Sequence, residues 1–196
     1  GKEAKRLLEK ARASCAAALG VSAETIYFTS GGTESDCIPL LSLLNRPQKG
    51  TVLISSIEHP AIREQAQALA TCDWRVVSIP ATRDGIITAE AVLSKLTDDT
   101  ALVCVMAVNN ETGAVQPIGR IADALSQAAK NKRKAKLHVD CVQAAGKISL
   151  DLSHEGISSA AFSAHKIGGP RGIGILYSAD TIESFFRGGG QEKNIR

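Results

Sequence analysis

The sequence predicts an α/β fold in three layers, with a mostly parallel central sheet and helices on both faces. Apolar runs suited to strands alternate with segments whose apolar residues recur at helical spacing, which is the pattern of βαβ units. The run ALVCVMAV, residues 101–108, is apolar throughout, as a strand buried on both faces requires. With 196 residues, 44% of them hydrophobic, the chain can form one substantial core.

The elements follow from the spacing of apolar residues. Residues 2–19 have the pattern of an amphipathic helix, and IYFT at 26–29 is a short strand before a glycine turn. Further strands are expected at 51–55, 74–79, 101–108, 136–140, 160–164 and 172–177. The helices expected between them cover 33–45, 59–69, 88–96 and 119–130.

Composition and charge argue against several classes of protein. No stretch approaches the ~20 apolar residues of a membrane span, and the N-terminus GKEAKRLLEK has no apolar core of the signal-peptide kind. The densest basic run, KNKRKAK at 130–136, lacks interleaved aromatic residues, so we interpret it as the solvated end of a helix and expect no nucleic-acid partner.

The five cysteines are scattered and have no CxxC spacing, which indicates neither disulfides nor a metal site and fits a reducing, cytoplasmic compartment. They are Cys15, Cys37, Cys72, Cys104 and Cys141.

Polar residues follow several predicted strands directly, where open α/β sheets bind ligands. In FTSGGTES, a strand leads through Gly32 to a helix that begins at Thr33, and such a helix start can bind an anion, although Gly-Gly is often only a turn. His59 follows the strand at 51–55, where it could stack on a ring, move protons or merely cap a helix. Asn110 follows the most hydrophobic strand and could donate to a ligand oxygen or shape a turn.

Two further strands end in ionisable residues. Asp140 ends a strand with apolar neighbours, three residues before Gln143, and a buried carboxylate needs either a cationic ligand or a structural ion pair. In FSAHKIGG, we expect Ser163 and His165 on one side of an extended chain, with Lys166 out of phase with them. A lysine partly desolvated beside other cations has the lowered pKa that Schiff-base chemistry requires, whereas a lone lysine is usually solvated.

Taken together, these features match the needs of pyridoxal 5′-phosphate (PLP). Its phosphate binds N–H donors and hydroxyls, its ring needs a stacking partner, its phenolic oxygen a donor, its pyridine nitrogen an aspartate and its aldehyde a lysine.

The sequence resembles the NifS/IscS-type cysteine desulfurases, members of the class V aminotransferase branch of fold-type I PLP enzymes. Six motifs carry the resemblance in order along the chain: FTSGGTES, EHPAI, VNNETGAVQPI, HVDCVQAAGKI, SAHKIGGPRGIGILY and GGGQEKNIR. The resemblance implies that Lys166 binds PLP covalently and then moves protons, and that His59 stacks on the ring and assists proton transfer. It implies further cofactor contacts from Gly32, Thr33, Ser163 and His165 to the phosphate, Asp140 to the pyridine nitrogen, and Asn110 and Gln143 to the phenolic oxygen or the substrate.

The resemblance also implies a reaction and its partners. L-Cysteine would become L-alanine, while the sulfur passes to an enzyme cysteine as a persulfide and on to acceptor proteins, for iron–sulfur cluster assembly or tRNA thiolation. The nucleophilic cysteine of the family lies beyond the end of this sequence, so none of the five cysteines is expected to serve. We expect residues 1–196 to form the PLP-binding large domain of a homodimer, without the family's N-terminal segment and C-terminal small domain.

Other functions remain open at this point. Selenocysteine lyase, or another class V lyase or aminotransferase, would use the same cofactor residues. A non-catalytic scaffold could keep the fold. A dinucleotide-binding module is disfavoured, because GPRGIG lies between two predicted strands rather than between a strand and a helix.

Overall fold

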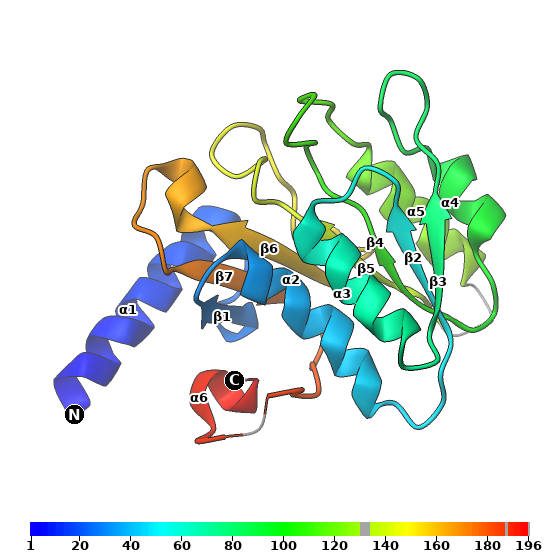
Figure 1. The fold of residues 1–196 in the computed structure, drawn as a ribbon. Helices are drawn as coiled ribbons and strands as arrows, with labels where there is room; N and C mark the ends of the chain where they lie inside the picture. Colours follow the sequence, from blue (N-terminus) through cyan, green and yellow to red (C-terminus); the bar gives the residue numbers. More distant parts are fainter. Residues whose placement is uncertain (130–133, 187, 196) are drawn as a thin grey trace.

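The computed structural model describes residues 1–129, 134–186 and 188–195. A seven-stranded sheet in the order β1-β7-β6-β5-β4-β2-β3 forms its centre (Figure 1). The strands are β1 Ile26–Thr29, β2 Thr51–Ser55, β3 Arg75–Ile79, β4 Thr100–Cys104, β5 Lys136–Asp140, β6 Ser159–Ser163 and β7 Gly174–Ser178. Neighbouring strands pair in parallel except where β7 pairs with β1 and β6. The predicted mostly parallel sheet is therefore confirmed.

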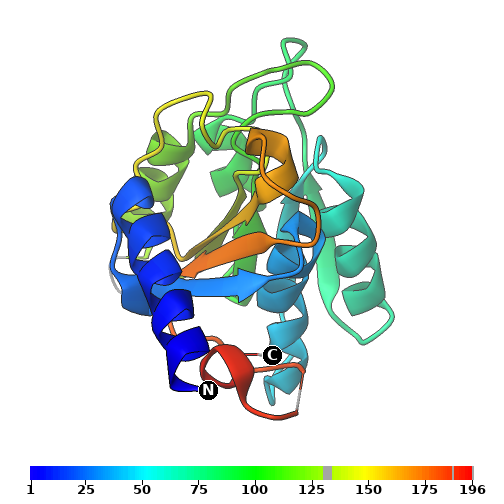
Figure 2. The ribbon, with the colours of Figure 1, turned by 90° about the vertical axis from the view of Figure 1, so that its left-hand side faces the viewer.

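Helices cover both faces of the sheet. The α-helices are α1 Lys2–Leu19, α2 Gly32–Leu41, α3 Pro60–Ala70, α4 Ala89–Lys95, α5 Ile118–Ala128 and α6 Gln191–Asn194. Short 3-10 helices lie at Ala23–Thr25 (η1), Ser42–Asn45 (η2) and Ala164–Ile167 (η3). Figures 1 and 2 show α2 and α3 on one face, with α1, α4 and α5 on the other.

The two halves of the core explain why the central strands are apolar throughout. Successive side chains of a strand point to opposite faces. In β2, Val52 packs on the side of Ile62 and Leu69 from α3, while Leu53 belongs to the cluster that contains Leu125 from α5. A strand with helices on both faces needs apolar residues at every position, as the central strands have.

Several predicted elements end earlier than expected, among them two strands and one helix. The strand at 101–108 is β4, which ends at Cys104, although the N–H groups of Val105 and Ala107 still donate to carbonyls of β5. The helix at 33–45 is α2, which ends at Leu41 and continues as η2; Pro39, which lacks an N–H donor, lies in its last turn. The strand at 160–164 is β6, which ends at Ser163.

The basic run falls partly outside the described residues, because 130–133 are not among them. Of the rest, Lys134 donates to the carbonyl of Glu155, and Lys136 pairs with Asp180 at 3.2 Å. Within the described ranges, no helix has the length and apolar character to cross a membrane.

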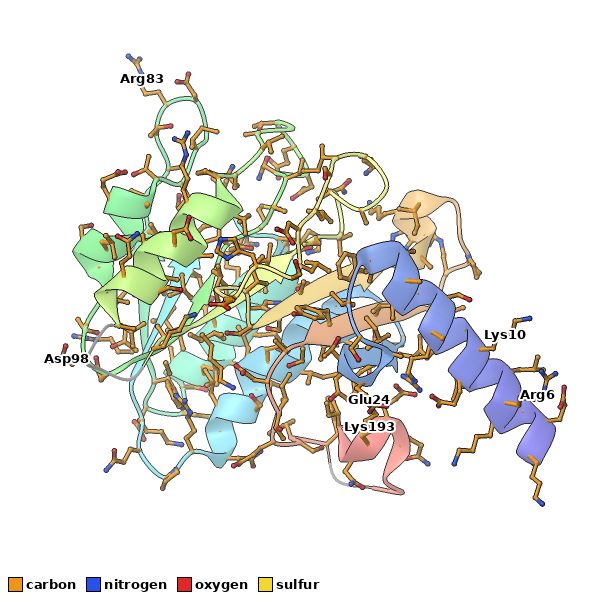
Figure 3. All side chains as sticks on the ribbon, turned by 180° about the vertical axis from the view of Figure 1, so that it is seen from behind. Arg6, Lys10, Glu24, Arg83, Asp98 and Lys193 are labelled. Atoms are coloured by element: carbon orange, nitrogen blue, oxygen red, sulfur yellow. The ribbon has the colours of Figure 1, made fainter. Side chains whose placement is uncertain are left out.

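The C-terminal turn is fastened to α1 by a buried ion pair. Arg12 donates to Glu192 at 2.6 Å, and both side chains are at least nine-tenths buried. Arg12 also donates to the carbonyl of Ile26, and Glu192 accepts from the N–H of Phe28, so the pair holds α6 against β1. Figure 3 shows Lys193 facing Glu24 at the same junction, where their charged groups lie 2.6 Å apart. The residues from the two ends of the chain therefore pack together.

Candidate functional site

A cavity of about 270 Å³ lies at the carboxyl ends of the parallel strands. It contains all nine residues that the sequence suggested for a cofactor: Gly32, Thr33, His59, Asn110, Asp140, Gln143, Ser163, His165 and Lys166. Asp36, Ala61, Met106 and Val142 complete the lining. Residues from five separate connections thus meet at one edge of the sheet, as expected for strands that run in the same direction.

The start of α2 forms one wall of the cavity. A Cβ on Gly32 would lie 2.7 Å from Cγ2 of Val142, so only glycine allows this close approach. The turn before the helix is fixed by Glu34, whose carboxylate accepts from the N–H of Ser30 at 2.6 Å. Since the first N–H groups of a helix have no intrahelical partner, this wall presents donors and the positive end of the helix dipole to an anion.

His59 both caps a helix and lines the cavity. Its Nδ1 accepts from the N–H of Ala61 at 3.1 Å, which places it at the N-cap of α3. In the neutral ring, that hydrogen bond leaves the proton on Nε2. The capping interpretation and the functional one are therefore compatible, because the cap fixes the orientation of the ring.

The two neighbouring asparagines have different positions. Asn109 is buried, its Oδ1 accepts from the N–H groups of Glu111 and Thr112, and its Nδ2 donates to the carbonyl of Ile57. Asn109 therefore shapes the turn, while Asn110 is exposed and lines the cavity.

Asp140 is buried at the end of β5 beside the cavity. Its Oδ1 accepts from the N–H of Val142 at 2.8 Å, and no basic group pairs with it in the described part of the chain. Burial raises the pKa of Asp140, while the Val142 hydrogen bond and nearby His59 oppose the rise. The structural ion pair that the sequence left open is thus not found among the described residues, and the carboxyl suits a cationic ligand.

The connection after β6 differs from the predicted extended chain. The chain turns into η3 after Ser163, so His165 and Lys166 lie on a 3-10 turn that ends at Gly168 with φ 82°. Ser163 Oγ and His165 Nδ1 are 2.9 Å apart. Lys166 is exposed rather than partly desolvated, because the turn lifts it to the rim of the cavity. Of the two alternatives that the sequence left open for the Lys166 side chain, this structure shows the solvated one.

A buried chain of hydrogen bonds lies beneath the cavity, and the sequence interpretation missed it. His138 Nδ1 is 2.8 Å from Ser159 Oγ, and His138 Nε2 is 3.0 Å from Asp36 Oδ1. Burial lowers the pKa of His138 to about 3 and raises that of Asp36 well above its usual range, so the pair is neutral. The chain ties α2 to β5 and β6. A histidine inside an apolar strand was the signal available in the sequence.

The cysteines do not supply a reactive thiol to the cavity. Burial raises the pKa of Cys104 and Cys141 well above the usual range and that of Cys37 to about 11. Cys72 is exposed, but it precedes β3 and so lies at the opposite edge of the sheet from the cavity. Thiolates, not thiols, are nucleophiles, so the three shifted cysteines are unsuited to sulfur chemistry.

The fold and the cavity place the protein among the α/β domains that bind ligands at the carboxyl edge of a parallel sheet. Comparison with known families makes the assignment specific: the model of the class-V aminotransferase family matches residues 1–195, and the chain belongs to this family.

Similar proteins are named as cysteine desulfurases or NifS-like proteins. The chain is 38% identical to the NifS/IcsS protein homolog of Lactobacillus delbrueckii subsp. bulgaricus, with all of this chain and 51% of the relative covered. It is 37% identical to the cysteine desulfurase NifS of Azotobacter vinelandii, with all of this chain and 48% of the relative covered. The chain therefore spans about half the length of the curated relatives it matches.

Solved structures agree with this comparison. A NifS-like protein superposes with a TM-score of 0.91 at 36% identity, covering all of this chain and 54% of that structure. A structure described as SspA in complex with cysteine gives a TM-score of 0.92 at 30% identity, covering all of this chain and 56% of that one.

Proposed function

We propose that this chain is the PLP-binding large domain of a cysteine desulfurase, which converts L-cysteine to L-alanine. The observation that carries the proposal is one cavity that unites Lys166, Asp140 and the start of α2. The names of its relatives support the activity, and the cysteine complex of a structural neighbour supports the substrate.

The residues of the cavity fit PLP in both charge and space. The phosphate is an anion, and the start of α2 with Thr33, Ser163 and His165 offers it N–H, hydroxyl and imidazole groups. The pyridine nitrogen is a cation when protonated, and Asp140 lacks a basic partner among the described residues. Gly32 leaves the space between α2 and Val142 that a side chain would fill.

Bound PLP supplies an electron sink for a carbanion at the α-carbon of an amino acid. The Nζ of Lys166 at the rim would hold the cofactor and would accept and return a proton at the α-carbon of the substrate. His59, oriented by its cap on Ala61, presents Nε2 to the ring or the substrate. The carboxylate of Asp140 would hold the proton on the pyridine nitrogen, and Asn110 and Gln143 would donate to the phenolic oxygen or bind the substrate.

The sulfur step needs a thiol from outside the cavity. Transfer of the substrate sulfur to a protein cysteine gives alanine and a persulfide, so the atoms balance without an added oxidant. None of the five cysteines is among the residues that line the cavity, and burial raises the pKa of three of them, so we assign the nucleophile to a cysteine outside residues 1–196. We further propose a homodimer in the cytoplasm that passes sulfur to acceptor proteins.

The test combines cofactor binding with turnover. Purified protein with PLP should develop a visible absorbance band that Lys166→Ala abolishes, whereas Lys147→Ala should retain it. When the nucleophilic cysteine assigned outside residues 1–196 is supplied with it, L-cysteine should yield alanine and sulfide in a reducing buffer. Release of alanine from L-selenocysteine alone would instead assign a selenocysteine lyase, and failure to bind PLP would leave a scaffold.

A further inference from the structure

Glu58 is a buried carboxyl group that the mechanism above does not use. It lies between β2 and α3, directly before His59, and is 6% exposed. Its Oε1 accepts from Ser55 Oγ at 2.5 Å and from the N–H of Met106 at 2.8 Å. Its Oε2 is buried and has no hydrogen-bond partner within the described ranges. One carboxyl oxygen therefore accepts two hydrogen bonds, while the other is buried and accepts none within the described ranges.

The hydrogen bonds of Glu58 join two walls of the cavity. Ser55 ends β2, and Met106 lies two residues beyond the end of β4, the strand that pairs with β2. His59 and Met106 both line the cavity. The carboxyl of Glu58 therefore sets the separation between the His59 wall and the Met106 wall, without lining the cavity itself.

The electrostatic surroundings of Glu58 disfavour a negative charge. Asp140 on β5 is a buried carboxyl whose charge raises the pKa of Glu58, and burial favours the protonated forms of Asp36 on α2 and of Cys104 on β4. His138 on β5 is buried and neutral, with its pKa lowered to about 3. No described basic group forms an ion pair with Glu58.

We propose that Glu58 is a positioning residue that acts as a neutral carboxylic acid, holding His59 and Met106 at the spacing a bound ring requires. The identity of that ring rests on the proposed function. Burial and the charge of Asp140 raise the pKa of Glu58 to about 8, which agrees with this assignment. When a cation occupies the cavity, Asp140 is held as an anion. Because Glu58 is protonated, Asp140 is then the one negative charge of this pair of carboxyl groups.

The substitution Glu58→Gln tests the proposal because an amide keeps the size and neutrality of the protonated acid. Glu64→Gln, which neutralises an exposed glutamate on α3, is the matched control. PLP affinity is measured by absorbance titration from pH 6.5 to 9.5 for the native protein and both variants. At pH 7, we expect E58Q to bind within about twofold of the native protein. Between pH 7 and pH 9, the native Kd should rise roughly tenfold relative to that of E58Q, because Glu58 ionises above its pKa of about 8 and ionisation of one linked group changes affinity by at most tenfold per pH unit above that pKa.

Three results would overturn the proposal. They are superimposable pH profiles for the native protein and E58Q, a folded E58Q that has lost PLP binding at pH 7, and an E58Q that does not fold. If the native protein binds no PLP, the proposed function fails, yet Glu58 remains testable in the ligand-free protein. There, the thermal midpoint of E58Q minus that of the native protein should increase from pH 5 to pH 8, because the native fold keeps a proton that the unfolded chain releases. A difference in thermal midpoint that stays constant from pH 5 to pH 8 would contradict the proposal that Glu58 is a neutral acid in the folded protein.

Discussion

Replacing His138 with glutamine should make the protein less sensitive to acid. Gln reaches Asp36 as the imidazole Nε2 does, but it leaves Ser159 without its partner at 2.8 Å. We expect a loss of about 1–3 kcal/mol at pH 7.5, the usual cost of leaving a buried polar group unsatisfied.

The pH dependence follows from the lowered pKa of His138. The folded protein binds the proton with a pKa of about 3, whereas the usual value is 6.5. The stability due to the neutral imidazole is therefore complete above pH 6.5 and is lost as the pH falls toward 3. Between pH 7.5 and pH 5, the native protein should lose about 2 kcal/mol of unfolding free energy relative to H138Q.

The assay is urea unfolding of the native protein and H138Q at both pH values. His154→Gln serves as a control, because His154 is a partly exposed histidine paired with Asp123 at 3.2 Å. At pH 7.5, the unfolding free energy of the native protein should exceed that of H138Q. At pH 5, this difference should be smaller by about 2 kcal/mol. A difference in unfolding free energy that does not change with pH would refute the claim that His138 is a buried, neutral imidazole.

Two further substitutions test the cavity. Gly32→Ala places a Cβ 2.7 Å from a Val142 methyl, which displaces the start of α2, so PLP affinity should fall by about tenfold or more. The control Gly119→Ala, with no neighbouring atom within 4 Å of its Cβ, should bind PLP normally. Asp140→Asn should weaken PLP binding. In the ligand-free protein, it should raise the unfolding free energy, and this gain should grow as the pH rises above about 4, because burial raises the pKa of Asp140 and its ionisation therefore opposes folding. Equal PLP affinity of the native protein and D140N would argue against the assigned contact.

The fold and much of the cavity were predictable because local patterns specify them. Apolar runs with helices between them fix a parallel sheet, and a parallel sheet brings the residues after its strands to one edge. The cavity residues were found because each one lies at the end of a strand, in the connection that follows it, or at the start of a helix.

What the sequence missed depends on contacts between distant residues. Asp36 is the fifth residue of α2, and its pairing with His138 joins positions 102 residues apart. Glu58 is buried only because Met106 and Ser55 fold around it. Lys166 is exposed because β6 ends at Ser163 and the chain turns into η3, a turn that the apolar pattern of the sequence did not predict.

Covalent attachment of PLP to Lys166 is the central claim, and reductive trapping tests it most directly. The protein is incubated with PLP, reduced with borohydride and digested, and the modified lysine is located by mass spectrometry. Lys147 is an internal competitor, since its Nζ binds Gln143 at the cavity at 2.9 Å. We predict that Lys166 carries the label. Labelling of Lys147 instead, or no label at all, would contradict the account.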